Sequence, residues 1–139
     1  INLCGNPFDT ALAASHLIYG GVLDAFPKLE VSLPHAGGVL TALRGRLDRG
    51  FHTRAECKTI SKPPSSYLKR FTYDTISYNE ELLEDLIKLV GADRILVGSD
   101  YCFDIAYEEP IRYLNGVKSL TADQRQQIVW DNAAKLLHL

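Results

Sequence analysis

Two side chains that can bind a metal ion or move a proton each stand shortly after an apolar, strand-like segment. His35 follows residues 29–33, and Asp100 follows residues 95–98. Parallel strands of α/β proteins gather ligands and catalytic groups at their carboxyl ends, so we expect the two side chains to meet at one edge of a sheet. There they could be two metal ligands, a base with the acid that orients it, or unrelated turn and cap residues.

Motifs for two other kinds of chemistry do not accompany this pair. The sequence lacks the GxSxG pattern of a serine nucleophile, which disfavours a covalent hydrolase. The glycines behind His35 lack the GxxxxGK[ST] spacing, which disfavours a flavodoxin-like binder of phosphate or nucleotides. The three interpretations of His35 and Asp100 stay open at this point.

Three segments have the composition of strands. Residues 95–98 are apolar and β-branched without an alternating polar face, which predicts a parallel strand covered on both faces. Residues 29–33 alternate in part and end before a proline, and the two glycines behind His35 permit a tight turn or a close approach to a ligand. Residues 71–76, rich in aromatic and β-branched side chains, are the third predicted strand.

Apolar residues at helical spacing predict helices between and after these strands. Asp9, Asn79 and Asn132 are the predicted caps of the first, third and last helix, and Thr121 opens a capping box. The predicted helices cover about residues 10–26, with an interruption at Gly20 and Gly21, and residues 39–51, 80–90, 110–117, 122–130 and 133–137. Strict alternation of strand and helix predicts parallel strands joined by right-handed crossovers. A closed eight-stranded barrel needs roughly 250 residues, so this chain could supply only part of one.

Composition is that of one α/β domain over residues 1–139. The chain is 46% hydrophobic and carries a net charge of −2, with 15 basic and 17 acidic residues mixed along its length. Without a basic stripe we expect no nucleic-acid partner, and without an apolar run of about 20 residues or a signal peptide we expect no membrane partner. The three cysteines, at irregular spacings, predict reduced thiols and a cytoplasmic location. A chain that opens with Ile1 and contains no Met is expected to be a piece of a longer protein.

Five stretches of the sequence, in order, resemble the C-terminal half of the amidohydrolase-2 group, the proteins similar to aminocarboxymuconate-semialdehyde decarboxylase. They are GGVLDAFPKL at 20–29, PHAGG at 34–38, GRLDRGF at 45–51, VGSDY at 97–101 and NAAKLL at 132–137. The resemblance covers nearly the whole chain and is unspecific about the substrate.

The resemblance implies a distorted (β/α)8 barrel with a divalent metal, zinc, at its C-terminal mouth. Asp100 matches the metal-ligand aspartate of strand eight, and His35 matches the strand-six histidine that does acid–base work beside the metal. Arg46 matches an arginine that contacts the substrate carboxylate across a subunit interface, which implies a homo-oligomer. Tyr78 stands where some members have a histidine, so the wall of the substrate site is expected to differ.

The HxH pair and the fifth-strand histidine of the family are not matched in this chain. One aspartate, with or without one histidine, should hold zinc weakly, so the chain alone is expected to be inactive. Joined by the missing N-terminal half, in the same polypeptide or as a partner, it is expected to form a metal-dependent hydrolase or non-oxidative decarboxylase. Its substrate would be a small carboxylated or aromatic molecule.

A non-catalytic half-barrel is the rival hypothesis. Such a binding or assembly module would present an open strand edge and an apolar helix face formed by Leu82, Leu86 and Val90.

Overall fold

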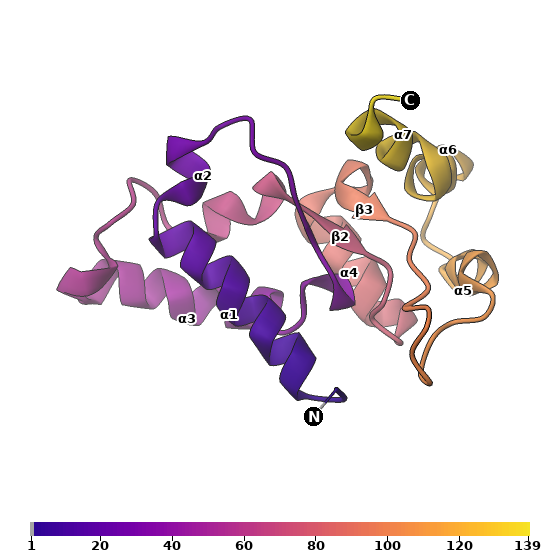
Figure 1. Ribbon diagram of the computed structural model, residues 1–139, viewed down its shortest axis with the longest axis horizontal. Helices are drawn as coiled ribbons and strands as arrows, with labels where there is room; N and C mark the ends of the chain where they lie inside the picture. The colour runs from indigo at the N-terminus through magenta and orange to yellow at the C-terminus, as the bar shows by residue number, and fades with distance from the viewer. Residues whose placement is uncertain (1) are drawn as a thin grey trace.

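Three parallel strands lie at the centre of the computed structural model, which describes residues 2–139 (Figure 1). The strands are β1 (Val31–Leu33), β2 (Phe71–Asp74) and β3 (Ile95–Leu96), and they pair in the order β1-β2-β3. Leu33 lies opposite Tyr73, and Tyr73 lies opposite Ile95. The predicted direction of the strands is confirmed, and their carboxyl ends therefore lie at one edge of the sheet.

Helices precede, join and follow the strands. The α-helices are α1 (Gly5–Tyr19), α2 (Val22–Ala25), α3 (Leu40–Thr53), α4 (Glu80–Val90), α5 (Pro110–Gly116), α6 (Ala122–Gln126) and α7 (Asn132–Leu137). Short 3-10 segments are η1 (His35–Gly37), η2 (Ala55–Cys57), η3 (Pro64–Arg70) and η4 (Ala92–Arg94), and the π-helical turn η5 (Gln127–Asp131) joins α6 to α7. Figure 1 shows α1, α2 and α3 on one side of the strands and α5, α6 and α7 on the other. No helix within residues 2–139 has the length and apolar composition that crossing a bilayer would require.

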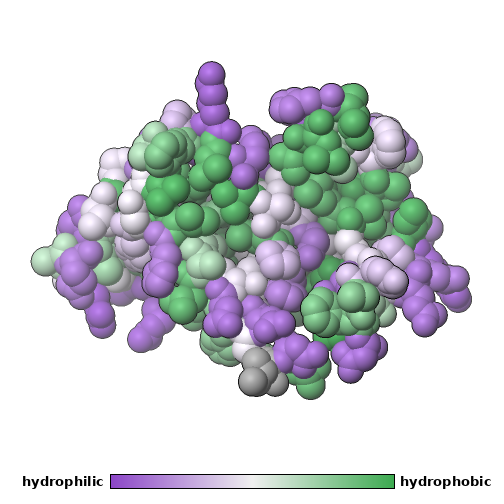
Figure 2. All heavy atoms as spheres, viewed as in Figure 1, coloured by the Kyte–Doolittle hydropathy of each residue, from purple (hydrophilic) through white to green (hydrophobic). Residues whose placement is uncertain are grey.

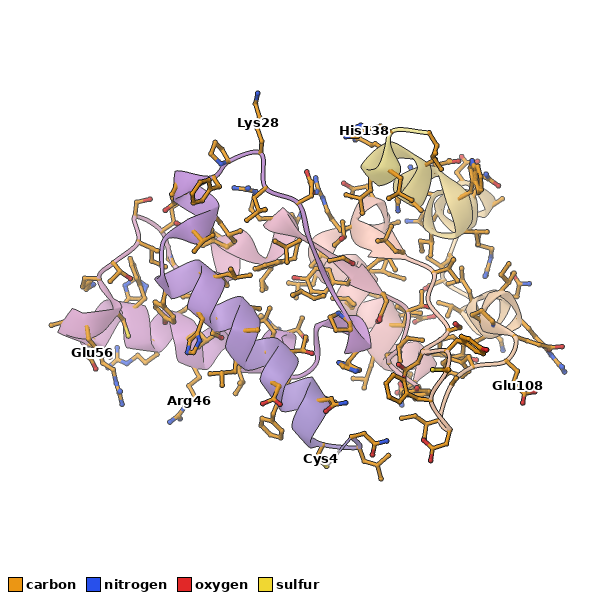
Figure 3. All side chains as sticks on the ribbon, viewed as in Figure 1. Cys4, Lys28, Arg46, Glu56, Glu108 and His138 are labelled. Carbon is orange, nitrogen blue, oxygen red and sulfur yellow. The ribbon has the colours of Figure 1, made fainter. Side chains whose placement is uncertain are left out.

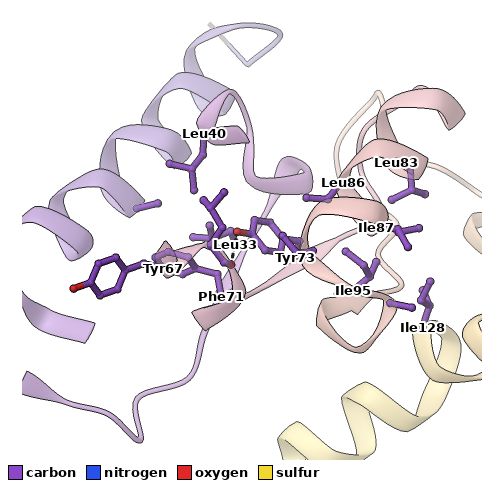
Figure 4. Packing of buried hydrophobic residues seen from close by; sticks show 14 of the residues in the cluster. Leu33, Leu40, Tyr67, Phe71, Tyr73, Leu83, Leu86, Ile87, Ile95 and Ile128 are labelled. Atoms are coloured by element: carbon purple, nitrogen blue, oxygen red, sulfur yellow. Dashed lines mark hydrogen bonds between the residues drawn. The ribbon is translucent and has the colours of Figure 1, made fainter. Parts of the chain in front are cut away.

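One face of the sheet forms the centre of the hydrophobic core. The strand register places Leu33, Phe71, Tyr73 and Ile95 on this face, and all four side chains are buried. They belong to one cluster with apolar residues of α4, and Figure 4 shows this packing. The Tyr73 hydroxyl, which would be costly to bury without a partner, donates a hydrogen bond of 2.7 Å to the Leu68 carbonyl.

The apolar stripe of α4 faces this core, as its spacing predicts. Asn79 caps the helix through its side chain, which accepts a hydrogen bond from the Leu82 N–H at 2.9 Å. The apolar face proposed above for association is nevertheless largely internal, because Leu86 and Val90 are buried and only Leu82 is exposed. That part of the rival hypothesis is wrong.

β3 is shorter and more exposed than predicted. Ile95 is buried, whereas Leu96 and Val97 are only half-buried. β3 forms an edge of the sheet that residues 2–139 build, so nothing pairs with its outer side. Beyond the paired residues, the Val97 N–H donates instead to the Ile128 carbonyl at 3.1 Å.

Two predicted helix caps are wrong. The first helix begins after Cys4 rather than after Asp9, with Pro7 in its first turn, where a missing N–H costs nothing. Asn132 lies inside a continuous helical run, and its side-chain amide donates to the carbonyls of Ala92 and Ile95, both at 2.8 Å. The capping box that opens α6 is confirmed.

Apolar side chains also lie on the surface, over α2 and over α6 and α7 (Figure 2). The large exposed ones in these regions include Phe26, Leu29, Trp130 and Leu137. Patches of this kind often mark contact surfaces in soluble proteins.

Candidate active site

A cavity of about 890 Å³ opens at the carboxyl ends of the strands. His35, which follows β1, and Asp100, which follows β3, both line it. Tyr78 and Ile76, from the segment after β2, and Phe103 contribute to the same wall. The structure thus brings together the two side chains that the sequence placed at strand ends.

His35 is held in an unusual backbone conformation. His35 and Ala36 both have left-handed backbones, with φ of 58° and 51°. The imidazole Nδ1 shares a hydrogen bond of 2.9 Å with Oγ1 of Thr10, a buried residue of α1. The other ring nitrogen, Nε2, forms no hydrogen bond within residues 2–139. It is therefore the nitrogen left to exchange a proton with a bound molecule.

Two glycines allow this turn to fit against its neighbours. A Cβ on Gly37, whose φ is +81°, would stand 2.7 Å from the ring of Tyr73. A Cβ on Gly38, whose φ is +58°, would overlap the carbonyl of Pro7. The close approach expected of these glycines is thus made to the core and to α1.

Asp100 is oriented by a tyrosine. The Tyr78 hydroxyl donates a hydrogen bond of 2.9 Å to Oδ2 of Asp100. Burial, together with the Asp100 carboxylate, raises the pKa of Tyr78 above its usual value of 10, so the phenol stays protonated as a donor at neutral pH. Oδ1 of Asp100 forms no hydrogen bond within the described chain. The carboxylate therefore offers one oxygen to a ligand.

Three tyrosine rings support this wall of the cavity. The rings of Tyr78 and Tyr107 have centroids 4.9 Å apart, and those of Tyr107 and Tyr113 are stacked at 4.3 Å. The Tyr113 hydroxyl shares a hydrogen bond of 2.9 Å with Oγ of Ser77, and the Tyr107 N–H donates to the Ser99 carbonyl at 2.8 Å. The contact between Tyr78 and Tyr107 ties the long loop after β3 to the segment after β2, and the bond between Tyr113 and Ser77 ties α5 to the same segment.

Asp74, at the end of β2, is a site residue that sequence reasoning missed. Its carboxylate lies between the other two strand ends and accepts N–H bonds from His35, Ala36 and Ile76. Burial raises the pKa of Asp74, while the three donated N–H bonds oppose that rise. The predicted strand at residues 71–76 runs two residues past Asp74, so the place of Asp74 at a strand end could not be predicted from that pattern.

The structure does not bring Arg46 to the cavity. Arg46 is exposed on α3, and Figure 3 shows its side chain pointing away from the ribbon. Arg44, two residues earlier, lines the cavity instead. Within this chain Arg46 is therefore not assembled with His35 and Asp100.

The residues that the structure describes do not form a complete metal site. Residues 2–139 contain no group of three histidine, cysteine, aspartate or glutamate side chains arranged to hold a metal ion. Catalytic zinc sites usually have three protein ligands. Asp100 could contribute one ligand to a site whose other ligands come from elsewhere.

The chain is similar to known proteins over nearly its whole length. A family model described as Amidohydrolase matches residues 3–139. The chain is 30% identical over 139 residues to a 2-amino-3-carboxymuconate-6-semialdehyde decarboxylase of Dictyostelium discoideum, covering 99% of the chain and 39% of that protein. It is 33% identical over 138 residues to a gamma-resorcylate decarboxylase of a Polaromonas species, covering 94% of the chain and 41% of that protein.

A solved structure resembles the chain in the same way. It is a dihydroxybenzoic acid decarboxylase from Polaromonas with bound manganese and the inhibitor 2-nitroresorcinol, with a TM-score of 0.83 and 28% identity. The match covers 96% of this chain and 41% of that one. The chain thus spans about two fifths of the length of the relatives it matches.

Proposed function

The chain belongs to the amidohydrolase family, and we propose that within a complete barrel it serves the non-oxidative decarboxylation of a small carboxylated aromatic or related substrate. The observation that carries this proposal is the convergence of His35 and Asp100 on one cavity at the carboxyl ends of parallel strands. The similar proteins named above are decarboxylases, which favours this reaction over hydrolysis or hydration.

The three strands and their helices correspond to part of a (β/α)8 barrel. We infer that residues 1–139 are its C-terminal portion and that an N-terminal half, in the same polypeptide or as a partner, supplies the remaining strands. The share of each relative that the chain covers, about two fifths, supports this division.

In this reaction the bond between the ring carbon and the carboxyl carbon breaks, carbon dioxide leaves, and the ring carbon takes a proton. His35 is placed to deliver that proton from Nε2, since Thr10 occupies Nδ1. Thr10 and the turn after β1 fix the plane of the imidazole. The apolar side chains of Ile76 and Phe103 line the same cavity.

We propose that Asp100 supplies one ligand to a divalent metal in the complete protein. Zinc is the metal that the family resemblance implies, and the similar Polaromonas structure holds manganese. When bound, such a metal polarises a substrate oxygen. Tyr78 would hold Oδ2 of the Asp100 carboxylate and leave Oδ1 as the oxygen available to a metal.

The experiment compares the chain alone with the chain joined to its N-terminal half, each loaded with zinc or manganese. Release of carbon dioxide from carboxylated phenols is measured beside hydrolysis of amides and esters. We expect decarboxylation by the joined protein only, lost in the variants His35→Gln and Asp100→Asn. Hydrolysis without carbon dioxide release would overturn the proposal.

A half-barrel module is the second candidate, favoured by the open outer sides of β1 and β3 and by the exposed apolar side chains over α2, α6 and α7. Its solution mass would be that of a stable oligomer, unchanged by a chelator. The enzyme hypothesis instead expects metal uptake that the N-terminal half restores.

A further inference from the structure

The carboxylate of Asp74 connects the end of β2 to the turn that carries His35. Oδ2 accepts the His35 N–H at 3.1 Å, and Oδ1 accepts the Ala36 N–H at 2.7 Å. Oδ1 also accepts the Ile76 N–H at 3.0 Å. One side chain therefore organises the backbone after two neighbouring strands.

If Asp74 only shaped its own turn, the bond from the Ile76 N–H would be enough. An aspartate that accepts an N–H two residues later forms an ordinary turn within its own segment. The bonds to His35 and Ala36 instead cross 39 and 38 residues of sequence. They hold two residues with left-handed backbones, a conformation that is disfavoured for residues other than glycine.

The direction of the imidazole depends on that backbone. A switch of residues 35 and 36 to the common right-handed or extended conformations would turn the Cα–Cβ bond of His35 and break its contact with Thr10. Strained conformations of this kind persist only where their surroundings enforce them. The Asp74 carboxylate accepts hydrogen bonds from the N–H groups of both strained residues.

We propose that Asp74 is a positioning residue that holds the turn at residues 35 and 36 so that the His35 imidazole faces the cavity. The inference deepens the proposed function, because it rests on His35 being the proton donor. Asp74 itself acts through the backbone and not on the substrate.

The test uses the 139-residue chain labelled for NMR, with the variant Asp74→Asn. Its amide can still accept at Oδ1, but its NH₂ group would oppose the N–H of His35. Asp48→Asn is the matched control, because the half-buried Asp48 also accepts a backbone N–H, that of Ser65 at 2.9 Å, and does not line the cavity. We expect Asp74→Asn to speed amide exchange at residues 35 and 36 by at least about ten-fold and to move the His35 ring signals. Unchanged exchange and ring signals at His35 would overturn the inference.

A second variant covers the case in which Asp74→Asn fails to fold. Glycine adopts a left-handed backbone without strain, so Ala36→Gly should reduce the need for the carboxylate. We expect the double variant Asp74→Asn/Ala36→Gly to regain cooperative unfolding. Failure of the double variant to fold would show that Asp74 stabilises the core rather than the turn, and would also overturn the inference.

Kinetics of the complete protein separate this inference from the proposed function. We expect Asp74→Asn to lower kcat with little change in KM, and to have no further effect in a His35→Gln background. A His35→Gln protein with full activity would refute the proposed role of His35. The NMR comparison would still report whether Asp74 holds the turn.

Discussion

Tyr78 and Asp100, which follow different strands, meet through a hydrogen bond of 2.9 Å from the phenol to the carboxylate. Both residues have left-handed backbones, with φ of 53° and 60°. The bond fixes one oxygen of the carboxylate and leaves the other for a ligand. Groups that orient a metal ligand commonly matter almost as much as the ligand itself.

Tyr78→Phe removes this bond and keeps the tilted ring contact with Tyr107. Because the side chain is partly exposed, the free energy of unfolding should fall by only about 1 kcal/mol. Metal affinity or kcat of the complete protein should fall by roughly 10-fold to 100-fold. Tyr101→Phe is the control, since the Tyr101 side chain is 88% exposed. Equal metal affinity in both variants would contradict an orienting role.

We expect Tyr107 to make the stability of the fold depend on pH in the alkaline range. Burial is the main cause that raises the pKa of Tyr107 above its usual value of 10, followed by the neighbouring Tyr113. Above pH 10 the unfolded chain therefore loses a proton that the folded chain keeps. The contribution of Tyr107 to the free energy of unfolding is thus complete below pH 10 and is lost as the pH rises above it. Urea unfolding between pH 9 and roughly 11 should show a shallower loss of stability for Tyr107→Phe than for the wild type. Identical slopes would show that this phenol is not protected in the folded state.

Replacing glycine by alanine should have opposite effects at two positions of the chain. Gly38→Ala should cost on the order of 3 kcal/mol, because the new methyl group overlaps the Pro7 carbonyl and the backbone is left-handed. Gly45→Ala should raise the free energy of unfolding by roughly 0.5–1 kcal/mol, because Gly45 lies in α3 with open space around it. Urea denaturation measures both, and a harmless Gly38→Ala would mean that the turn after His35 is looser than the structure shows.

If Arg46 acts across a subunit interface, variants of Arg46 and His35 should complement each other in a mixed oligomer. If its exposed guanidinium contacts the substrate carboxylate of a neighbouring copy, Arg46→Ala should raise KM by about ten-fold or more without a change in unfolding. At substrate concentrations near the wild-type KM, a mixture of Arg46→Ala and His35→Gln proteins should then be more active than either variant alone, because one of the two sites in a mixed dimer receives both native groups. Arg44→Ala is the parallel test of the arginine that lines the cavity in this chain. A mixture no more active than the sum of the two variants would assign Arg46 to the surface alone.

How far the sequence predicts this molecule depends on how local each interaction is. His35 and Asp100 could be found because each follows its own apolar strand, and parallel strands bring their carboxyl ends together. The Asn79 cap could be found because its partner, the Leu82 N–H, lies three residues away.

Interactions between distant segments were the ones that sequence reasoning missed. The N–H groups that Asp74 binds belong to another strand end, so nothing in its own segment reveals them. Asn132 has the composition of a cap, but its amide reaches the carbonyls of Ala92 and Ile95 some 40 and 37 residues earlier. The strand at residues 95–98 is shortened by the absence of a neighbour on its outer side within residues 2–139, which a local pattern cannot register.

Decarboxylation in deuterium oxide is the sharpest test of His35 as the proton donor. The complete, metal-loaded protein is given a carboxylated phenol such as gamma-resorcylate, and both carbon dioxide and ring deuterium are followed. We predict one deuteron on the ring carbon for each carbon dioxide released, and a kcat lowered by about 10²-fold to 10⁴-fold in His35→Gln. Carbon dioxide release at the wild-type rate by His35→Gln would show that His35 is not the proton donor.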